Sequence, residues 1–95
     1  MADVSKVFLA LQAVEESKAV VAAIEKDNPE AEIGYDAAMV KITAPSRLTI
    51  NAETVSGLIG REWDTQELQI ILITLSGNVD EDYDHFTLFW AEHYY

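Results

Sequence analysis

The sequence has 95 residues, of which 17 are acidic and 6 are lysine or arginine, so the formal net charge is −11. Apolar residues make up 49% of it, which is typical of a folded globular chain, and we expect one domain over residues 1–95. The few basic residues are spread singly, which argues against nucleic acid or an anionic membrane as partner. Because there is no cysteine, disulfides and thiolate metal sites are excluded.

The beginning of the chain lacks the pattern of a secretory signal. MADVSKVFLALQAVEESK has no basic leading region, and its apolar run of about five residues is too short. No stretch approaches the ~20 apolar residues that a membrane-spanning helix needs. We therefore expect a soluble protein of the cytoplasm.

The first third of the chain predicts one strand and one helix. The apolar run at 7–12 is typical of a buried or edge strand. Residues 15–26 carry apolar side chains at three-to-four spacing, with acidic residues first and a lysine last, which predicts a helix. Asn28 and Pro29 are expected to end that helix.

Short β patterns follow at 32–35 and 38–43. Pro45 is expected to end the second of them, since proline cannot donate to a strand ladder. One more short strand is predicted at 47–50. Asn51 then suits the N-cap of a second helix.

This second helix is predicted to be short, with Val55 and Leu58 facing inward. Gly57 weakens it by roughly 1 kcal/mol relative to alanine. Gly60 lies where a left-handed residue commonly closes a helix. Because so short a helix is marginal alone, the segment 56–59 is a plausible place for movement.

The last third of the chain predicts a long antiparallel hairpin. Residues 67–76 resemble a strand of about ten residues that runs into a Gly77-Asn78 turn, and after an acidic crest at 80–84 a second strand at 85–90 returns beside it. Neither face of the first strand is polar. That strand is therefore either covered on both sides, or the face with Ile71 and Ile73 is a binding surface.

The acidic crest has the one-three-five carboxylate spacing of a calcium-binding EF-hand loop. His85 stands where that loop needs glycine, and Ala91 stands where it needs a bidentate glutamate. The segment also precedes a strand and not a helix. The pattern therefore favours a solvated hairpin tip over a metal site.

Signatures of catalysis are missing from the sequence. His85 and His93 are the only histidines, and they form no spaced metal-ligand pair. There is no G-x-S-x-G and no glycine-rich nucleotide loop. Trp63 and Trp90 are either core residues or interface anchors. The residues alone thus indicate a small, acidic protein-binding module.

Three segments of the sequence resemble one known family. GREWDTQEL at 60–68, ITLSGNVDED at 73–82 and HFTL at 85–88 are similar to the coupling proteins of bacterial multicomponent di-iron monooxygenases. The likeness extends to EKDNP at 25–29 and NAETV at 51–55, so it covers most of the chain. The regulatory component of phenol hydroxylase is the nearest likeness, and methane monooxygenase component B is a more distant relative.

This resemblance implies an α+β fold in β-α-β-β-α-β-β order, with two helices, a long C-terminal antiparallel hairpin and no metal or organic cofactor. It implies a non-catalytic effector that binds the di-iron hydroxylase of an aromatic monooxygenase, alongside an NADH-dependent reductase, and promotes coupled oxygen activation. In that family the partner-facing surface includes the end of the second helix. That region corresponds here to Ser56, Gly57, Leu58 and Ile59.

Two alternatives from other classes stay open. A small acidic enzyme could use the carboxylates at 80–84. A structural subunit could bind permanently with no effect on a catalytic rate. Intrinsic turnover of the purified protein would favour the first, and stoichiometric binding without a rate effect would favour the second.

Overall fold

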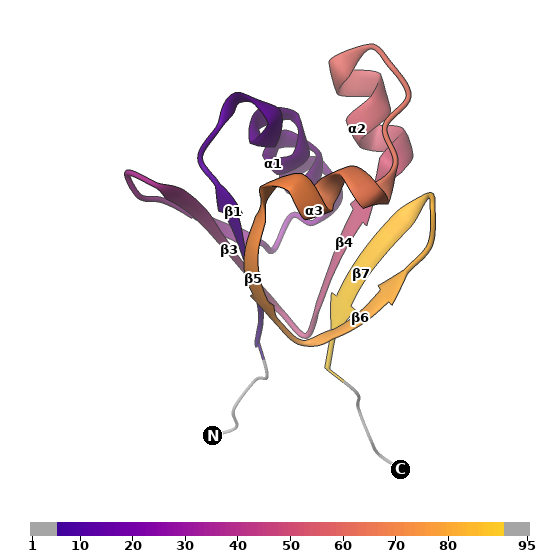
Figure 1. The fold of residues 1–95 in the computed structure, drawn as a ribbon. Coiled ribbons are helices and arrows are strands. Elements are labelled where there is room, and N and C mark those ends of the chain that lie inside the picture. Colours follow the sequence, from indigo (N-terminus) through magenta and orange to yellow (C-terminus); the bar gives the residue numbers. More distant parts are fainter. Residues whose placement is uncertain (1–5, 91–95) are drawn as a thin grey trace, which may run out of the picture.

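Two antiparallel sheets meet at an angle, and the helices lie within and across the open side of that angle (Figure 1). The structure is a computed structural model that describes residues 6–90. The larger sheet has the order β2-β3-β1-β5 and the smaller one β4-β7-β6. The strands are β1 (Lys6–Gln12), β2 (Glu32–Tyr35), β3 (Met39–Pro45), β4 (Arg47–Asn51), β5 (Leu72–Ser76), β6 (Asn78–Glu81) and β7 (His85–Phe89). The helices are α1 (Glu15–Asp27), α2 (Ala52–Ile59) and α3 (Leu68–Ile71), with a 3₁₀ turn at Thr65–Glu67.

Strand β1 is the centre of the larger sheet because it pairs with β3 on one side and with β5 on the other. Its residues Val7, Leu9, Ala10 and Leu11 are fully buried. The apolar run thus occupies the position that its composition favours, covered on both faces.

The chain crosses between the sheets through single residues. Ser46 joins β3 to β4 with φ 68°, and Gly77 joins β5 to β6 with φ 138°. A Cβ atom on Gly77 would lie 3.2 Å from both the Leu88 Cγ and the Val7 Cγ1 atoms. Glycine is therefore required at this corner both for its backbone conformation and for the space.

Helix α1 packs its apolar stripe against both sheets and ends as the sequence predicts. Asn28 caps it and also ties it to β4: the Asn28 Nδ2 atom donates to the carbonyl oxygen of Ile24 at 3.0 Å and to that of Thr49 at 2.7 Å. The Thr49 amide donates back to the Asn28 Oδ1 atom at 3.0 Å. Together these bonds fix the orientation of the helix relative to the smaller sheet.

Most of the first two thirds of the chain is predicted correctly. The helix, the strand at 32–35 and the strand at 47–50 are confirmed, and Gly60 closes α2 in the left-handed conformation with φ 79°. Strand β3 extends to Pro45, which pairs with Lys6, the first residue of β1. Asn51 occupies the N-cap of α2, but its side chain donates to the Asp27 Oδ2 atom at 2.9 Å and makes no capping bond. The α+β class is confirmed.

The prediction of one long strand at 67–76 is wrong. Residues 65–71 are helical, and only Leu72–Ser76 is a strand, which pairs with β1 and not with β7. The C-terminal hairpin is formed by β6 and β7, with its turn at 82–84. A capping box explains the difference: the Asp64 side chain accepts from the Gln66 amide at 2.9 Å, and the Glu67 side chain accepts from the Asp64 amide.

No helix in the described part of the chain is both long and apolar enough to cross a membrane.

Of the two tryptophans, Trp63 is buried in the core. Trp90 is partly buried against that core, and its indole Nε1 donates to the Lys6 carbonyl oxygen at 2.8 Å.

We expect Gly77→Ala to lower the free energy of unfolding by about 1–3 kcal/mol, because the new side chain is both strained and crowded at the corner. The matched control is Gly34→Ala, where no atom lies within 4 Å of the added Cβ and φ is not in the left-handed region. Urea unfolding of both variants measures the difference. Equal stability of the two variants would contradict the role of the corner.

Candidate functional site

A groove of about 450 Å³ lies among the three helices. Its floor is apolar and buried, with Val55 of α2, Trp63 and Ile71 of α3 each at most 6% exposed. Its edges carry Leu58 of α2, which is 48% exposed, and Ile70 of α3, which is 70% exposed. Large aliphatic side chains that remain accessible beside an apolar groove are typical of a binding surface.

The exposure of Leu58 corrects the prediction that it faces inward. Helix α2 is eight residues long, and its buried side chains are Ala52 and Val55 in the first turn. Gly60 then ends the helix, so Leu58, almost one turn beyond Val55, reaches past the core to the edge of the groove.

The rim of the groove is mainly acidic. Glu15 and Glu16 lie at the start of α1, and Glu67 lies at the start of α3. The two cations of the rim are already paired: the Lys18 Nζ atom lies 3.2 Å from the Glu15 Oε1 atom, and Arg61 pairs with Glu67. These pairs also neutralise two of the three rim carboxylates, so the rim, with three carboxylates and two cations, carries a formal net charge of −1.

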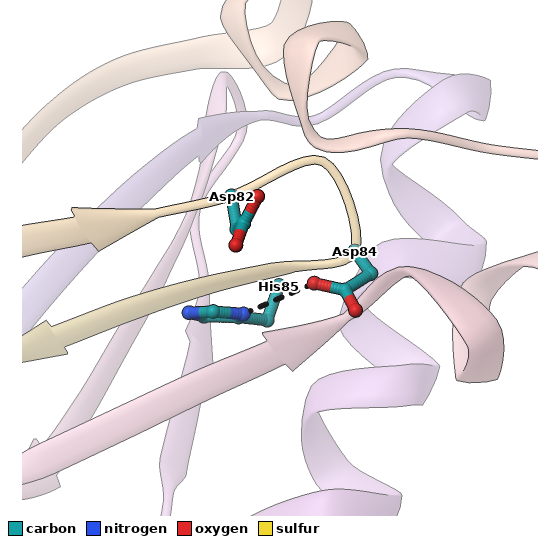
Figure 2. Close-up of side chains that lie close together, drawn as sticks. All are labelled: Asp82, Asp84 and His85. Carbon is teal, nitrogen blue, oxygen red and sulfur yellow. Dashed lines mark hydrogen bonds and ion pairs between the residues drawn. The ribbon is translucent and has the colours of Figure 1, made fainter.

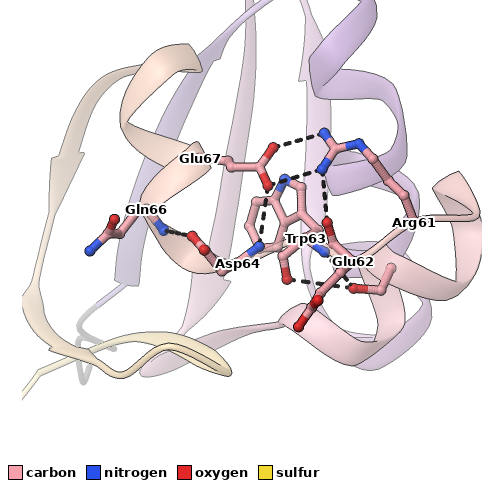
Figure 3. Close-up of polar contacts among 7 residues, drawn as sticks. Arg61, Glu62, Trp63, Asp64, Gln66 and Glu67 are labelled. Carbon is pink, nitrogen blue, oxygen red and sulfur yellow. Dashed lines mark hydrogen bonds and ion pairs between the residues drawn. The ribbon is translucent and has the colours of Figure 1, made fainter.

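The loop from α2 to α3 is held by polar contacts (Figure 3). Arg61 donates through Nη2 to the Glu67 Oε1 atom at 2.8 Å and through Nη1 to the Oε2 atom at 3.0 Å, which is a bidentate ion pair. The hydrogen bond from Arg61 lowers the pKa of the Glu67 carboxyl below its ordinary value. The Arg61 Nη1 atom also donates to the Glu62 carbonyl oxygen at 2.8 Å.

Ser56 closes the same loop from the inside. The Trp63 amide donates to the Ser56 Oγ atom at 2.9 Å, and Trp63 is buried. One predicted site residue, Ser56, thus directs its side chain toward the loop, and Gly57 beside it has no atom within 4 Å of an added Cβ. Ile59 is half-buried and lines the groove.

The structure does not bring Ile71 and Ile73 onto one face, as an unbroken strand would. Ile71 ends α3 and is 3% exposed. Ile73 lies in β5 and is 44% exposed, at a register shift where Leu72 and Thr74 pair with consecutive residues of β1. The sequence interpretation missed Ile70, and the capping box that starts at Asp64 is the signal that would have revealed it.

The acidic crest of the sequence is the exposed turn of the β6–β7 hairpin (Figure 2). Within residues 6–90, Asp82, Asp84 and His85 are the three metal-ligating side chains whose ligand atoms lie within 4.8 Å of one another. The His85 Nδ1 atom lies 3.2 Å from the Asp84 Oδ1 atom, and the Asp82 Oδ1 atom accepts from the Tyr83 amide at 2.8 Å. These contacts fit the predicted solvated tip.

The pKa of His85 is raised above its ordinary value of 6.5, first by the hydrogen bond to Asp84 and further by the charges of Asp80 and Asp82. The imidazolium contacts therefore stabilise the turn fully below pH 6.5, and this contribution is lost as the pH rises through the folded-state pKa.

We expect an NMR titration of His85 to show a midpoint above 6.5 that falls in Asp84→Asn. Asp36→Asn, outside the turn, should leave it unchanged; a wild-type midpoint at or below 6.5 would contradict the contact.

A small α+β protein that presents apolar side chains inside an acidic rim has the surface of a protein-binding module. The chain belongs to the MmoB/DmpM family, whose model matches residues 5–89. It is 46% identical, over 90% of its own length and 96% of the relative's, to the phenol 2-monooxygenase stimulatory component DmpM of Pseudomonas sp. (strain CF600).

Solved structures agree with this assignment. A chain in a structure of a phenol hydroxylase–regulatory protein complex is 45% identical, with a TM-score of 0.88 over 92% of this chain and all of that chain. Soluble methane monooxygenase regulatory protein B is 18% identical and has a TM-score of 0.72, over 96% of this chain and 69% of that chain. The second likeness concerns the fold alone.

Proposed function

We propose that this protein is the non-catalytic effector component of a multicomponent phenol monooxygenase. It binds the di-iron hydroxylase and raises the rate of oxygen activation and its coupling to hydroxylation of the aromatic substrate. It acts in the cytoplasm, beside an NADH-dependent reductase, and needs no cofactor of its own.

One observation supports this proposal above the others. The structural relative with a TM-score of 0.88 is a chain from a phenol hydroxylase–regulatory protein complex, and the likeness extends over all of that chain. The stimulatory component with 46% identity agrees with it.

The physical requirement on such an effector is differential affinity. A protein that bound every hydroxylase conformation equally would change no equilibrium between them, however tightly it bound. The effector must therefore contact a part of the hydroxylase that changes when its active site becomes competent, and those contacts must be better in the competent state.

The groove and the end of α2 are the surface that we assign to this contact. Leu58 and Ile59 of α2 and Ile70 of α3 line the groove, and Gly57 is the exposed residue that precedes Leu58 on α2. Ser56 and Ile71 support this surface from within, since one holds the loop and the other forms the floor. Ile73 would extend it along β5, where its side chain is accessible.

The experiment that tests the proposal is a titration of this protein into purified hydroxylase and reductase, with phenol oxidation and NADH consumption followed together. A rise in rate and in product formed per NADH, saturating near a stoichiometric ratio, is the expected result. Saturable binding with no change in either quantity would instead show a structural subunit, and turnover by the protein alone would show an enzyme.

We expect Gly57→Gln to lower activation of the hydroxylase without destabilising the effector. The site is open, so glutamine fits and should stabilise α2 by up to about 1 kcal/mol, yet its side chain adds bulk to the docking surface. Gly57→Ala is the matched control, with a gain in helix propensity at least as large and little bulk. Full activation by Gly57→Gln would remove this position from the interface.

We expect Leu58→Asp and Ile70→Asp each to weaken binding to the hydroxylase by about tenfold or more, because exposed apolar anchors at the centre of an interface carry much of its binding energy. Val79→Asp is the control, since Val79 is 45% exposed, close to the 48% of Leu58, but lies on β6 outside the groove. Fluorescence titration measures the three affinities. Equal loss in all three would show a general charge effect.

A further inference from the structure

The loop between α2 and α3 contains most of GREWDTQEL, one of the segments that carry the family resemblance. The structure anchors this loop at three places. Ser56 accepts from the Trp63 amide, Thr65 donates to the Asp82 carbonyl oxygen at 2.6 Å, and Arg61 forms its bidentate pair with Glu67. Trp63 and Thr65 are buried, so the first two anchors belong to the core.

The third anchor is different because it lies at the surface. The side chain of Arg61 is 59% exposed and that of Glu67 is 31% exposed. An ion pair so placed adds little to the free energy of folding. Its geometry nevertheless spans the loop, since Arg61 follows the end of α2 and Glu67 immediately precedes α3.

The ion pair therefore connects the two elements that carry the exposed apolar side chains of the groove. Leu58 lies on α2, three residues before Arg61, and Ile70 lies on α3, three residues after Glu67. Both charged residues also line the groove. Loss of the pair frees two long side chains and the exposed part of the loop, which binding would then have to order again.

We propose that the Arg61–Glu67 pair is a positioning latch that holds the edges of the docking groove at the spacing that the hydroxylase requires. This inference rests on the proposed function, because the partner is the hydroxylase. The two residues act through Leu58 and Ile70 and not by direct recognition of the partner. Glu67 also accepts from the Asp64 amide in the capping box, so the test variants keep a hydrogen-bond acceptor at position 67.

The test is a double-mutant cycle. Arg61→Gln and Glu67→Gln should each weaken the Kd for the hydroxylase about 2- to 10-fold, the range expected when one or two ordered side chains are released. The double variant Arg61→Gln with Glu67→Gln should weaken the Kd no further than either single variant, within about twofold, because all three variants remove the same interaction. Lys41→Gln, which removes an exposed ion pair with Asp36 away from the groove, should leave the Kd unchanged.

A second measurement is made on the free effector. Amide hydrogen exchange over 57–63 should speed up to a similar extent in both single variants and in the double variant, while the urea midpoint of all four proteins stays the same. A lowered urea midpoint in the single variants that accounts for their weaker Kd would overturn the latch in favour of a structural role.

The outcomes separate the latch from the proposed function. If wild type binds and activates but the single variants bind equally well, the latch is overturned and the effector function stands. If the losses of the two single variants add in the double variant, Arg61 and Glu67 each contact the hydroxylase directly, and the latch is again overturned. If wild type does not bind a cognate hydroxylase, both proposals fail.

Discussion

The angle between the two sheets is the constraint on which the rest of the structure depends. The chain passes between the sheets at Ser46 and at Gly77, each time through one residue with positive φ, so the corners are sharp. Helix α1 fills the space between the sheets, and Asn28 ties it to β4. With this space filled, α2 and α3 remain outside it, and their apolar side chains become either groove floor or groove edge.

This arrangement explains why so small a protein has an accessible apolar surface. A chain of 95 residues has limited interior volume, and here α1 and the inner faces of the sheets occupy it. Val55, Trp63 and Ile71 extend the core to the base of the groove, whereas Leu58 and Ile70 have no room inside. These five residues thus form an apolar path from the core to the surface of the groove.

Sequence reasoning succeeded where the determinants are local. The stripe of α1 and its end at Asn28 lie within one window of the chain, as does the glycine that closes α2. It failed at 67–76, because an apolar run alone does not distinguish a strand from a short helix followed by a strand. It also interpreted Gly77 as a hairpin turn, whereas the glycine is a corner between sheets. Which strand pairs with β5 is decided by distant residues of β1.

The same distinction applies to the candidate site. Resemblance to a family indicated the end of α2, and four of the six candidate residues lie there. The other two were chosen from strand alternation, which the helical turn of α3 interrupts, so Ile71 is core and Ile73 is accessible. Ile70 and the Arg61–Glu67 pair depend on how the loop closes in three dimensions, and no periodicity of the sequence encodes that.

Strand β6 forms one edge of the smaller sheet, and all four of its residues are exposed. An edge of this kind offers unpaired backbone groups to any second strand, including the same strand of another copy. Asp80 and Glu81 lie on it, next to the charged turn, so two copies aligned edge to edge would bring carboxylates against carboxylates. The acidity of this hairpin thus opposes edge-to-edge pairing of two copies of the protein through β6.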